Sequence, residues 1–249
     1  MLRLSLRDRL PGGSFAHNLW FEASRTTYAL FLTLAYRFRV FGRHNLPAKG
    51  PALLVCNHQS FLDPIINGAA ASPHHLVFVA RMGLFKFKPF SKLIESYNAI
   101  PIRQGEADTA AIRAALEQLA MGRIVLVYAE GQRTPDGAMH PFQRGAAVLL
   151  KRAKCPVIPM AIEGAFDAWP RHKKFPSLWG HRIAAAVGPT IPADELLAEG
   201  ADGALRRLES EIDTMRMALR DTLRQSTGGD RPAAGIGDQP MLRTLAKKS

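Results

Sequence analysis

Two residues that could carry acid–base chemistry follow a short apolar run in the first quarter of the chain. The stretch LVCNHQSFLDP covers residues 54–64 and contains His58 and Asp63, five positions apart. On a helix, residues five apart are separated by about 140° and do not share a face. Pro64 favours a helix that starts here with Asp63 as its N-cap, so residues 57–62 are expected to form a loop. Such a loop could return the Asp63 carboxylate to the His58 imidazole.

A carboxylate beside one imidazole nitrogen fixes the tautomer of the ring and stabilises its protonated form. The other nitrogen is then suited to accept a proton, and a hydroxyl of the substrate could supply it. Cys56 lies two residues before His58, on the same face of a strand, so a Cys–His acyl relay is an alternative. The simplest alternative is that Asn57, His58 and Asp63 only form a turn and a helix cap.

The elements that must position these residues alternate along the chain. Short apolar runs predict strands, and apolar residues at helical spacing, with Asp108 as a cap and Gly122 just past the end, predict a helix over 107–122. A second helix is expected over 145–153. The expected strands are 52–56, 75–80, 99–102, 124–129, 156–162 and 182–187. The pattern predicts an α/β fold with a largely parallel central sheet and helices on both faces.

Further polar residues follow other expected strands. Arg103 comes just after the run 99–102, and Glu130, Gly131 and Arg133 come just after 124–129. Ligands of open parallel sheets bind outside the carboxyl ends of the strands. We therefore expect these residues at the same edge of the sheet as His58, although a surface ion pair for Arg103 and a Glu130–Arg133 pair are the structural alternatives.

The composition favours an anionic partner. The chain has 249 residues, of which 47% are hydrophobic, and a formal net charge of +12 from 33 Lys+Arg against 21 Asp+Glu. This excess suits a membrane surface, a nucleic acid or an anionic small substrate. Cys56 and Cys155 are the only cysteines, and without CxxC spacing they indicate neither zinc nor a disulfide framework. No metal motif is recognised, and a reducing cytoplasmic setting fits best.

The two ends of the chain differ from its centre. Residues 1–40 are expected to form a membrane-associating helical segment, because the uncharged run Thr26–Tyr36 lies between Arg25 and Arg37. As a helix this run would span roughly 16 Å, too short to cross a bilayer alone, so it would lie in the interface or pack as a core helix. Residues 201–225 carry a helical apolar stripe expected to pack on the domain 41–200, and residues 226–249 are expected to be disordered.

Four motifs in a fixed order resemble the lysophosphatidic acid acyltransferases and their glycerolipid acyltransferase relatives. They are NHQSFLD from Asn57 to Asp63, an Arg after a short strand at Arg103, EGQRT from Glu130 to Thr134, and PVIPMAIEG from Pro156 to Gly164. The resemblance covers roughly residues 40–190. The chain departs from the usual Phe-Pro-Glu-Gly-Thr-Arg of the family, with Tyr128, Ala129 and Gln132 at the changed positions, and has Asn98 where Gly is common.

The resemblance implies transfer of a fatty acyl group from a thioester to the hydroxyl of lysophosphatidic acid, which gives phosphatidic acid. His58 would be the general base and Asp63 would orient it. Arg133 and Arg103 would hold the phosphate of the acceptor, and Glu130 would hold a neighbouring hydroxyl or Arg133. Gly131 would let the backbone approach the ligand. No cofactor is implied, and the donor would be acyl-CoA or acyl carrier protein.

The expected partners are a membrane lipid acceptor and a membrane surface, with no nucleic acid. The expected location is the cytoplasmic face of the membrane, as a peripheral or monotopic protein. The loop Trp169–His181 mixes aromatic and basic residues, which suits the headgroup zone. Three alternatives remain open: another lyso-acceptor such as a lyso-ornithine lipid, a thioesterase in which water replaces the acceptor, and a non-catalytic lipid-binding protein.

Overall fold

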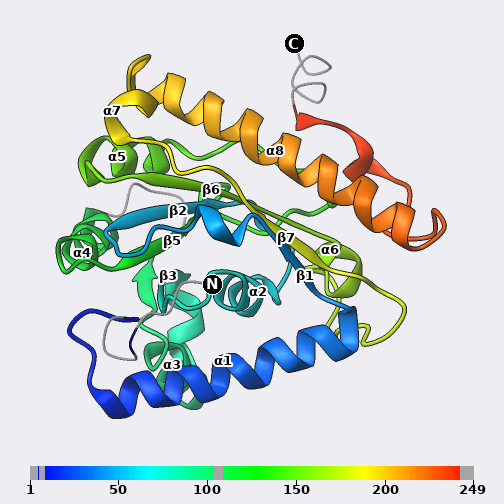
Figure 1. Ribbon diagram of the computed structural model, residues 1–249, viewed down its shortest axis with the longest axis horizontal. Helices are drawn as coiled ribbons and strands as arrows, with labels where there is room; N and C mark the ends of the chain where they lie inside the picture. The colour runs from blue at the N-terminus through cyan, green and yellow to red at the C-terminus, as the bar shows by residue number, and fades with distance from the viewer. Residues whose placement is uncertain (1–4, 6–8, 104–108, 242–249) are drawn as a thin grey trace.

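The computed structural model describes residue 5 and residues 9–103 and 109–241. These residues form a seven-stranded sheet in the order β1-β7-β6-β2-β5-β3-β4, with helices on both faces (Figure 1). The strands are β1 (Arg39–Phe41), β2 (Ala52–Cys56), β3 (Leu76–Arg81), β4 (Ile100–Ile102), β5 (Ile124–Tyr128), β6 (Val157–Glu163) and β7 (Ala184–Val187). The prediction of an α/β fold with a largely parallel central sheet is confirmed.

The helices complete the alternation that the sequence predicts. They are α1 (Phe15–Tyr36), α2 (Asp63–Ala70), α3 (Lys88–Glu95), α4 (Thr109–Ala120), α5 (Arg144–Ala153), α6 (Ala165–Ala168), α7 (Ala193–Leu196) and α8 (Gly200–Ser226). The expected cap of α4 at Asp108 lies outside the described residues. The strand β1 and the helix α3 were not predicted, because β1 is only three residues long and α3 buries none of its side chains.

The central strands β2 and β6 are buried along their whole length because both faces of the sheet are covered, and all their residues except Glu163 are apolar. Every residue of β2 and of β6 is buried, as expected for parallel strands between two helix layers. One core forms between the sheet and α4, α5 and α8, and the other lies between the sheet and α1 and α2. The strand β7 runs antiparallel to β6, so its first residue, Ala184, lies beside Glu163 at the carboxyl end of β6.

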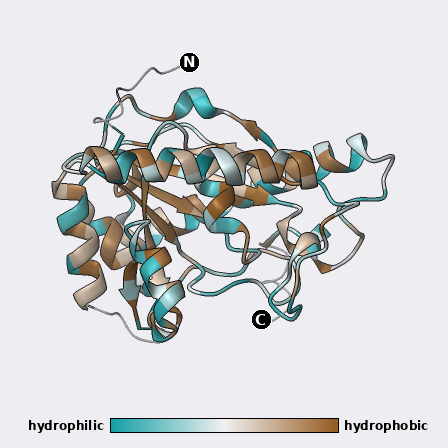
Figure 2. Cartoon of the chain, turned by 90° about the horizontal axis from the view of Figure 1, so that it is seen from below, coloured by the Kyte–Doolittle hydropathy of each residue, from teal (hydrophilic) through white to brown (hydrophobic). Residues whose placement is uncertain are grey.

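The helix α1 begins well before the apolar run that the sequence marks. The Ser14 hydroxyl caps it by accepting the His17 N–H at 3.2 Å, and a left-handed Arg37 ends it. One side packs on the core through Phe21 and Leu32, whereas the other carries exposed apolar side chains. Hydrophobic residues recur along the length of α1 in Figure 2. The large exposed apolar side chains of α1 are Phe15, Leu19, Trp20, Leu30, Phe31 and Leu34. Within the described ranges, none of the helices has the length and apolarity to cross a membrane.

The tail expected to be disordered over residues 226–249 begins with the last residue of α8, residues 242–249 lie outside the described residues, and residues 227–241 are held against the domain. Residues 227–241 run back along α8 and are held by arginines spaced four residues apart on that helix; this segment is called the strap below (Figure 1). Arg216 Nη1 donates to the Gly237 carbonyl at 2.7 Å, and Arg220 Nη2 donates to the Ala233 carbonyl at 2.6 Å. Met241 is buried, and its N–H donates to Asp213. Hydrogen bonds from charged side chains hold the strap in place. The prediction of disorder rested on its low content of apolar residues, which gives no information about such bonds.

We predict that Asp238→Ala destabilises the fold. Asp238 Oδ1 lies 2.6 Å from Arg220 Nε and 2.7 Å from Arg224 Nη2, and these arginines hold the pKa of the carboxyl below its usual range. The loss should be about 1–3 kcal/mol of unfolding free energy near neutral pH. Because the carboxylate form is the stabilising one, the difference from wild type should begin to shrink as the pH falls below about 4, the pKa of a free carboxyl, and should be lost only below the lowered pKa of the folded protein. Chemical denaturation at several pH values measures this, with the exposed Asp221→Ala as control; equal effects of both variants would contradict it.

Candidate active site

The side chains of His58 and Asp63 are in contact. His58 Nδ1 lies 2.7 Å from Asp63 Oδ2, and the same oxygen accepts the N–H groups of Gln59 at 2.6 Å and Ser60 at 2.8 Å. Asp63 is fully buried at the start of α2, with Pro64 in the first turn. The expected N-cap role of Asp63 is wrong, because its carboxylate bonds back to the preceding loop and the cap position is Leu62. The contact with His58 was predicted correctly.

The imidazole ring of His58 is fixed on its face as well as at Nδ1. The ring of Tyr128 stacks on it, with centroids 4.0 Å apart and planes at 13°. The Tyr128 hydroxyl accepts a hydrogen bond from Asn67 Nδ2 at 3.0 Å, which fixes the tyrosine in turn. The His58 side chain retains 17% exposure, so one edge of the ring is accessible. With Nδ1 held by Asp63, Nε2 is the nitrogen left for a substrate.

Two side chains of the loop 57–62 hydrogen-bond to the backbone of other segments and so hold the loop in place. Asn57 makes a two-fold contact with the backbone of Ile162 in β6: its Oδ1 accepts the N–H at 2.8 Å and its Nδ2 donates to the carbonyl at 3.0 Å. The Ser60 hydroxyl donates to the Trp169 carbonyl at 2.8 Å. The sequence marked Asn57 only as part of a motif, and its role here is to hold the loop against the sheet.

Glu130 lies behind His58 and not beside Arg133. Its Oε1 accepts the His58 N–H at 2.7 Å and its Oε2 accepts the His140 N–H at 2.9 Å. The side chain is 3% exposed, and burial raises its pKa to about 8, a shift that the two N–H donors oppose. Both carboxyl oxygens are therefore used to join two loops, and the described residues form no Glu130–Arg133 ion pair.

Gly131 and Thr134 complete this connection. Gly131 has φ +73°, a left-handed conformation that glycine adopts readily, and its N–H donates to the Tyr128 carbonyl at 3.0 Å. A Cβ there would lie 3.0 Å from Gln143 Cγ. The turn lets residues 130–134 fold back, so the Thr134 N–H reaches the His58 carbonyl at 2.8 Å. Gly131 thus has a conformational role in the turn, independent of the expected approach of its backbone to a ligand.

Arg133 lies over the ring of Phe61, with its guanidinium carbon 3.4 Å from the ring centroid. Its Nη1 is buried and has no hydrogen-bond partner among the described residues. Burial lowers the pKa of Arg133; nearby Asp63 opposes the shift, and nearby Arg171 and Arg81 add to it. A buried donor without a partner, in a positive surrounding beside the His–Asp pair, is arranged to receive an anion.

Arg103 lies farther from the His–Asp pair. It is exposed just past β4, which is separated from β2 by β5 and β3. The neighbouring strand β3 ends in Arg81, one of the charges that act on Arg133. Arg81 was missed, although it has the same sequence signal as Arg103, an arginine that ends an apolar strand. Arg171 was expected only as a cation of the loop Trp169–His181 near lipid headgroups, and its place beside Arg133 was not predicted.

A buried polar chain connects the catalytic loop to α8. Gln59 Nε2 donates to Glu163 Oε2 at 2.8 Å, and Glu163 Oε1 accepts from Arg220 Nη1 at 2.6 Å. Arg216 Nη1 lies 3.6 Å from Glu163 Oε2. Sequence reasoning missed these residues, and the available signal was a Glu at the end of the otherwise apolar run 156–162.

Cys56 is fully buried in the core between the sheet and α2. Its thiol lies 3.6 Å from Asn67 Oδ1, and burial, with Asp63 nearby, raises its pKa well above the usual value. A thiol with a raised pKa is a poor nucleophile because the thiolate is the reactive form. The arrangement therefore gives no support to the Cys–His relay.

The fold and this edge define the class of protein: an α/β enzyme with a His–Asp pair and convergent arginines at the carboxyl edge of its sheet. The model of the family described as Acyltransferase matches residues 37–163, just over half of the chain. The chain belongs to this acyltransferase family, as its motifs predict.

Similar proteins include the 1-acyl-sn-glycerol-3-phosphate acyltransferase of Bacillus subtilis, 25% identical over 75% of this chain and 95% of that protein. The human 1-acyl-sn-glycerol-3-phosphate acyltransferase beta is 27% identical over 92% of this chain and 81% of that protein. The crystal structure of the 1-acyl-sn-glycerophosphate (LPA) acyltransferase PlsC from Thermotoga maritima is similar with a TM-score of 0.62 at 21% identity, covering 78% of this chain and 79% of that one. This likeness supports the fold.

We predict that Glu130→Gln removes a pH dependence of stability. The folded-state pKa of Glu130 is about 8 against 4.5 for the free group, so between these values unfolding releases a proton. Stability from this group is therefore highest below about pH 4.5 and falls as the pH rises through 8. The slope of unfolding free energy against pH should be less negative over this range in Glu130→Gln. Denaturation curves at stepped pH test this, and the exposed Glu117→Gln should keep the wild-type slope; an unchanged slope in Glu130→Gln would refute the shift.

Proposed function

We propose that this enzyme transfers a fatty acyl group from a thioester to the free hydroxyl of lysophosphatidic acid, forming phosphatidic acid. The observation that carries the proposal is the His58 Nδ1–Asp63 Oδ2 contact of 2.7 Å beside the unpartnered Arg133 Nη1. A base and an anion-binding group are what a phosphate-bearing alcohol requires. The names of the similar proteins from Bacillus subtilis and human support the same acceptor.

The mechanism follows from the free nitrogen of His58. Nε2 takes the proton of the acceptor hydroxyl as its oxygen forms a bond to the thioester carbonyl carbon. Asp63 stabilises the resulting imidazolium and keeps Nδ1 protonated. The tetrahedral intermediate then expels the thiolate by breaking the C–S bond, and the imidazolium returns its proton to the sulfur. The acyl group passes directly to the acceptor, without an acyl-enzyme.

The acceptor phosphate binds at Arg133. The planar guanidinium presents two parallel donors to phosphate oxygens, and stacking on Phe61 holds its plane. Arg171 Nη1 donates to the Arg133 carbonyl at 3.3 Å and adds positive charge beside it. Arg81 and Arg103 extend this positive edge along the sheet toward β4. Glu130 acts through the His58 backbone and is a positioning residue.

The acyl donor is acyl-CoA or acyl carrier protein, and no cofactor takes part. Both donors are anionic, and the net charge of +12 attracts either one. The enzyme works as a peripheral protein on the cytoplasmic face of a membrane, where its lipid acceptor lies. The exposed apolar side of α1 enters the interface, and Phe175, Leu178 and Trp179 add exposed apolar side chains from the loop before β7.

We predict that His58→Ala lowers the rate of transfer by roughly 10²–10⁴-fold without unfolding the protein, since the general base is lost. Asp63→Asn should also be severe, because an amide favours the wrong tautomer. Steady-state transfer of a labelled acyl group measures both. Cys56→Ala is the matched control and should keep most activity, with no acyl adduct at Cys56 by mass spectrometry. Wild-type turnover in His58→Ala, or such an adduct, would refute the mechanism.

For the acceptor site, we predict that Arg133→Lys raises the apparent KM for lysophosphatidic acid by roughly tenfold or more, because an ammonium keeps the charge but loses the two-donor geometry. The apparent KM for the acyl donor should change much less. Initial-rate measurements with each substrate varied separate the two, and Arg152→Lys on α5 is the control. If both KM values rise equally, Arg133 supports the fold and not the acceptor.

For the membrane, we predict that Leu19→Glu/Leu30→Glu weakens co-sedimentation with phospholipid vesicles and leaves the fold intact, since both side chains are more than half exposed. Wild-type binding should weaken but persist at high salt, because salt screens charge and leaves apolar burial. Circular dichroism checks the fold. Undiminished binding of the double variant would mean that α1 does not enter the interface.

A further inference from the structure

An open pocket of about 500 Å³ lies at the end of α1. Three segments far apart in the sequence line it: residues 34–37 at the end of α1, residues 179–182 before β7, and residues 227–231 of the strap. The ends of α1 and α8 lie on the same side of the molecule in Figure 1. Hydrogen bonds between Ile183 and the backbone of Tyr36 and Arg39 hold the first two segments together.

The pocket lies at the same edge of the sheet as the active site. Ala184, the first residue of β7, pairs with Glu163 at the carboxyl end of β6, and β6 runs parallel to β2, which leads into His58. The chain between β6 and β7 contacts both places: its residues 179–182 line the pocket, and the Trp169 carbonyl accepts the Ser60 hydroxyl of the catalytic loop. The pocket is thus a neighbour of the active site and not part of it.

The lining is strongly positive. Arg37, Arg182 and Arg231 line the pocket, and none has an ion pair or side-chain hydrogen bond among the described residues. Among the described residues that line the pocket, Asp230 is the only acidic one. The Nδ1 atom of His181 is buried and lacks a hydrogen-bond partner within the part of the chain described. Three unpaired guanidiniums against one carboxylate make a site for an anion that is larger than a chloride and can accept several hydrogen bonds.

Part of the pocket lining is apolar. Leu34 is 68% exposed and Trp179 is 75% exposed, and both line the pocket. Leu34 continues the exposed apolar side of α1 that the proposed function places in the membrane interface. Arginines and exposed apolar side chains in one lining match an amphiphile whose anion contacts the arginines while its chains stay in the bilayer.

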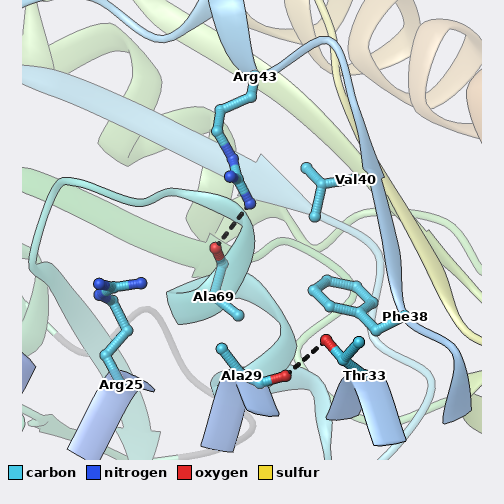
Figure 3. A pocket seen from close by; sticks show the side chains of 7 residues that line it. All are labelled: Arg25, Ala29, Thr33, Phe38, Val40, Arg43 and Ala69. Carbon is cyan, nitrogen blue, oxygen red and sulfur yellow. Dashed lines mark hydrogen bonds between the residues drawn. The ribbon is translucent and has the colours of Figure 1, made fainter. Parts of the chain in front are cut away.

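A second pocket provides a contrast. It has a volume of about 330 Å³, lies between α1 and α2, and is also lined by arginines (Figure 3). There, Arg25 Nη2 pairs with Glu22 at 2.7 Å, and Arg43 donates to the carbonyls of Ala69 and Ala70 at 3.1 Å each. Arg25 is thus paired within α1, and Arg43, in the turn Arg43–Asn45 that follows β1, joins that turn to α2, so the arginines of the pocket in Figure 3 already have partners.

We propose that the pocket lined by Arg37, Arg182 and Arg231 binds the phosphate of an anionic phospholipid that is not a substrate of the reaction. It rests on the proposed function in one respect, the placement of α1 against a bilayer. Burial of α1 alone would leave the enzyme free to rotate about the axis of this helix. A second contact at the pocket would stop that rotation and hold the carboxyl edge of the sheet toward the membrane surface.

The test is vesicle binding by the full-length chain carrying Arg182→Ala/Arg231→Ala. Affinity for vesicles of phosphatidylcholine with phosphatidylglycerol should fall roughly tenfold or more, since each cation near an anionic surface contributes about fivefold. Affinity for pure phosphatidylcholine should not change. The control Arg152→Ala/Arg206→Ala removes two exposed arginines from α5 and α8 and should have a smaller effect on phosphatidylglycerol binding. Arg182→Lys/Arg231→Lys keeps the charge and should bind less tightly than wild type, because a phosphate site uses the guanidinium fork.

Three results would overturn the proposal: unchanged binding of the alanine variant, an equal loss in the Arg152→Ala/Arg206→Ala control, or full binding by the lysine variant, which would indicate diffuse charge only. Turnover of a water-soluble short-chain acceptor should be unaffected in Arg182→Ala/Arg231→Ala; a parallel loss would assign these arginines to the acceptor site and also overturn it. If the wild-type enzyme acylates no lyso-acceptor, the proposed function fails, whereas the lipid-binding result stands on its own.

Discussion

The burial of the Asp63 carboxylate is the constraint around which the active-site edge is organised. A fully buried carboxylate is costly unless donors surround it. Here two backbone N–H groups and one imidazole nitrogen meet at a single oxygen, within 2.6–2.8 Å. The loop must fold around that oxygen to satisfy it. The stability of the loop and the orientation of the His58 ring therefore come from the same contacts.

The remaining polar residues hold the backbone that delivers those donors. Asn57 fixes the loop to β6, while Glu130 and Thr134 hold the N–H and the carbonyl of His58. These are side chain–backbone or backbone–backbone hydrogen bonds, which connect loops that have little apolar surface to bury. Most residues of such a motif hold the backbone of the loop in place, and few of them are available to contact a substrate.

The sequence predicted the strands well where apolar runs are continuous. The expected strand 52–56 is β2, because a strand covered on both faces must be apolar throughout. The antiparallel direction of β7 had no local signal, since periodicity does not report strand direction. The order of the strap was missed over 227–241, because composition measures apolar content, and arginines of a distant helix segment hold this chain.

The sequence predicted which residues lie at the site more reliably than it predicted the directions of their side chains. The contact of His58 with Asp63 follows from the turn that Pro64 imposes. The direction of the Glu130 side chain depends on two N–H groups from different loops, which only the folded chain brings together. Arg171 and Tyr128 contribute through tertiary contacts with Arg133 and His58, and spacing alone could not reveal either one.

The strap has a consequence for the order of events during synthesis. Arg220 contacts Glu163 on one side and the strap on the other, and Glu163 holds Gln59 beside His58. While the protein is being synthesised, the sheet leaves the ribosome before residues 227–241 do. Until those residues arrive, Arg216 lacks the Gly237 carbonyl, and Arg220 lacks the Ala233 carbonyl and the Asp238 carboxylate. The catalytic loop of the nascent polypeptide is then complete in sequence but lacks its outermost support. The support of the active site is therefore complete only after residues 227–241 have been synthesised and have packed on α8.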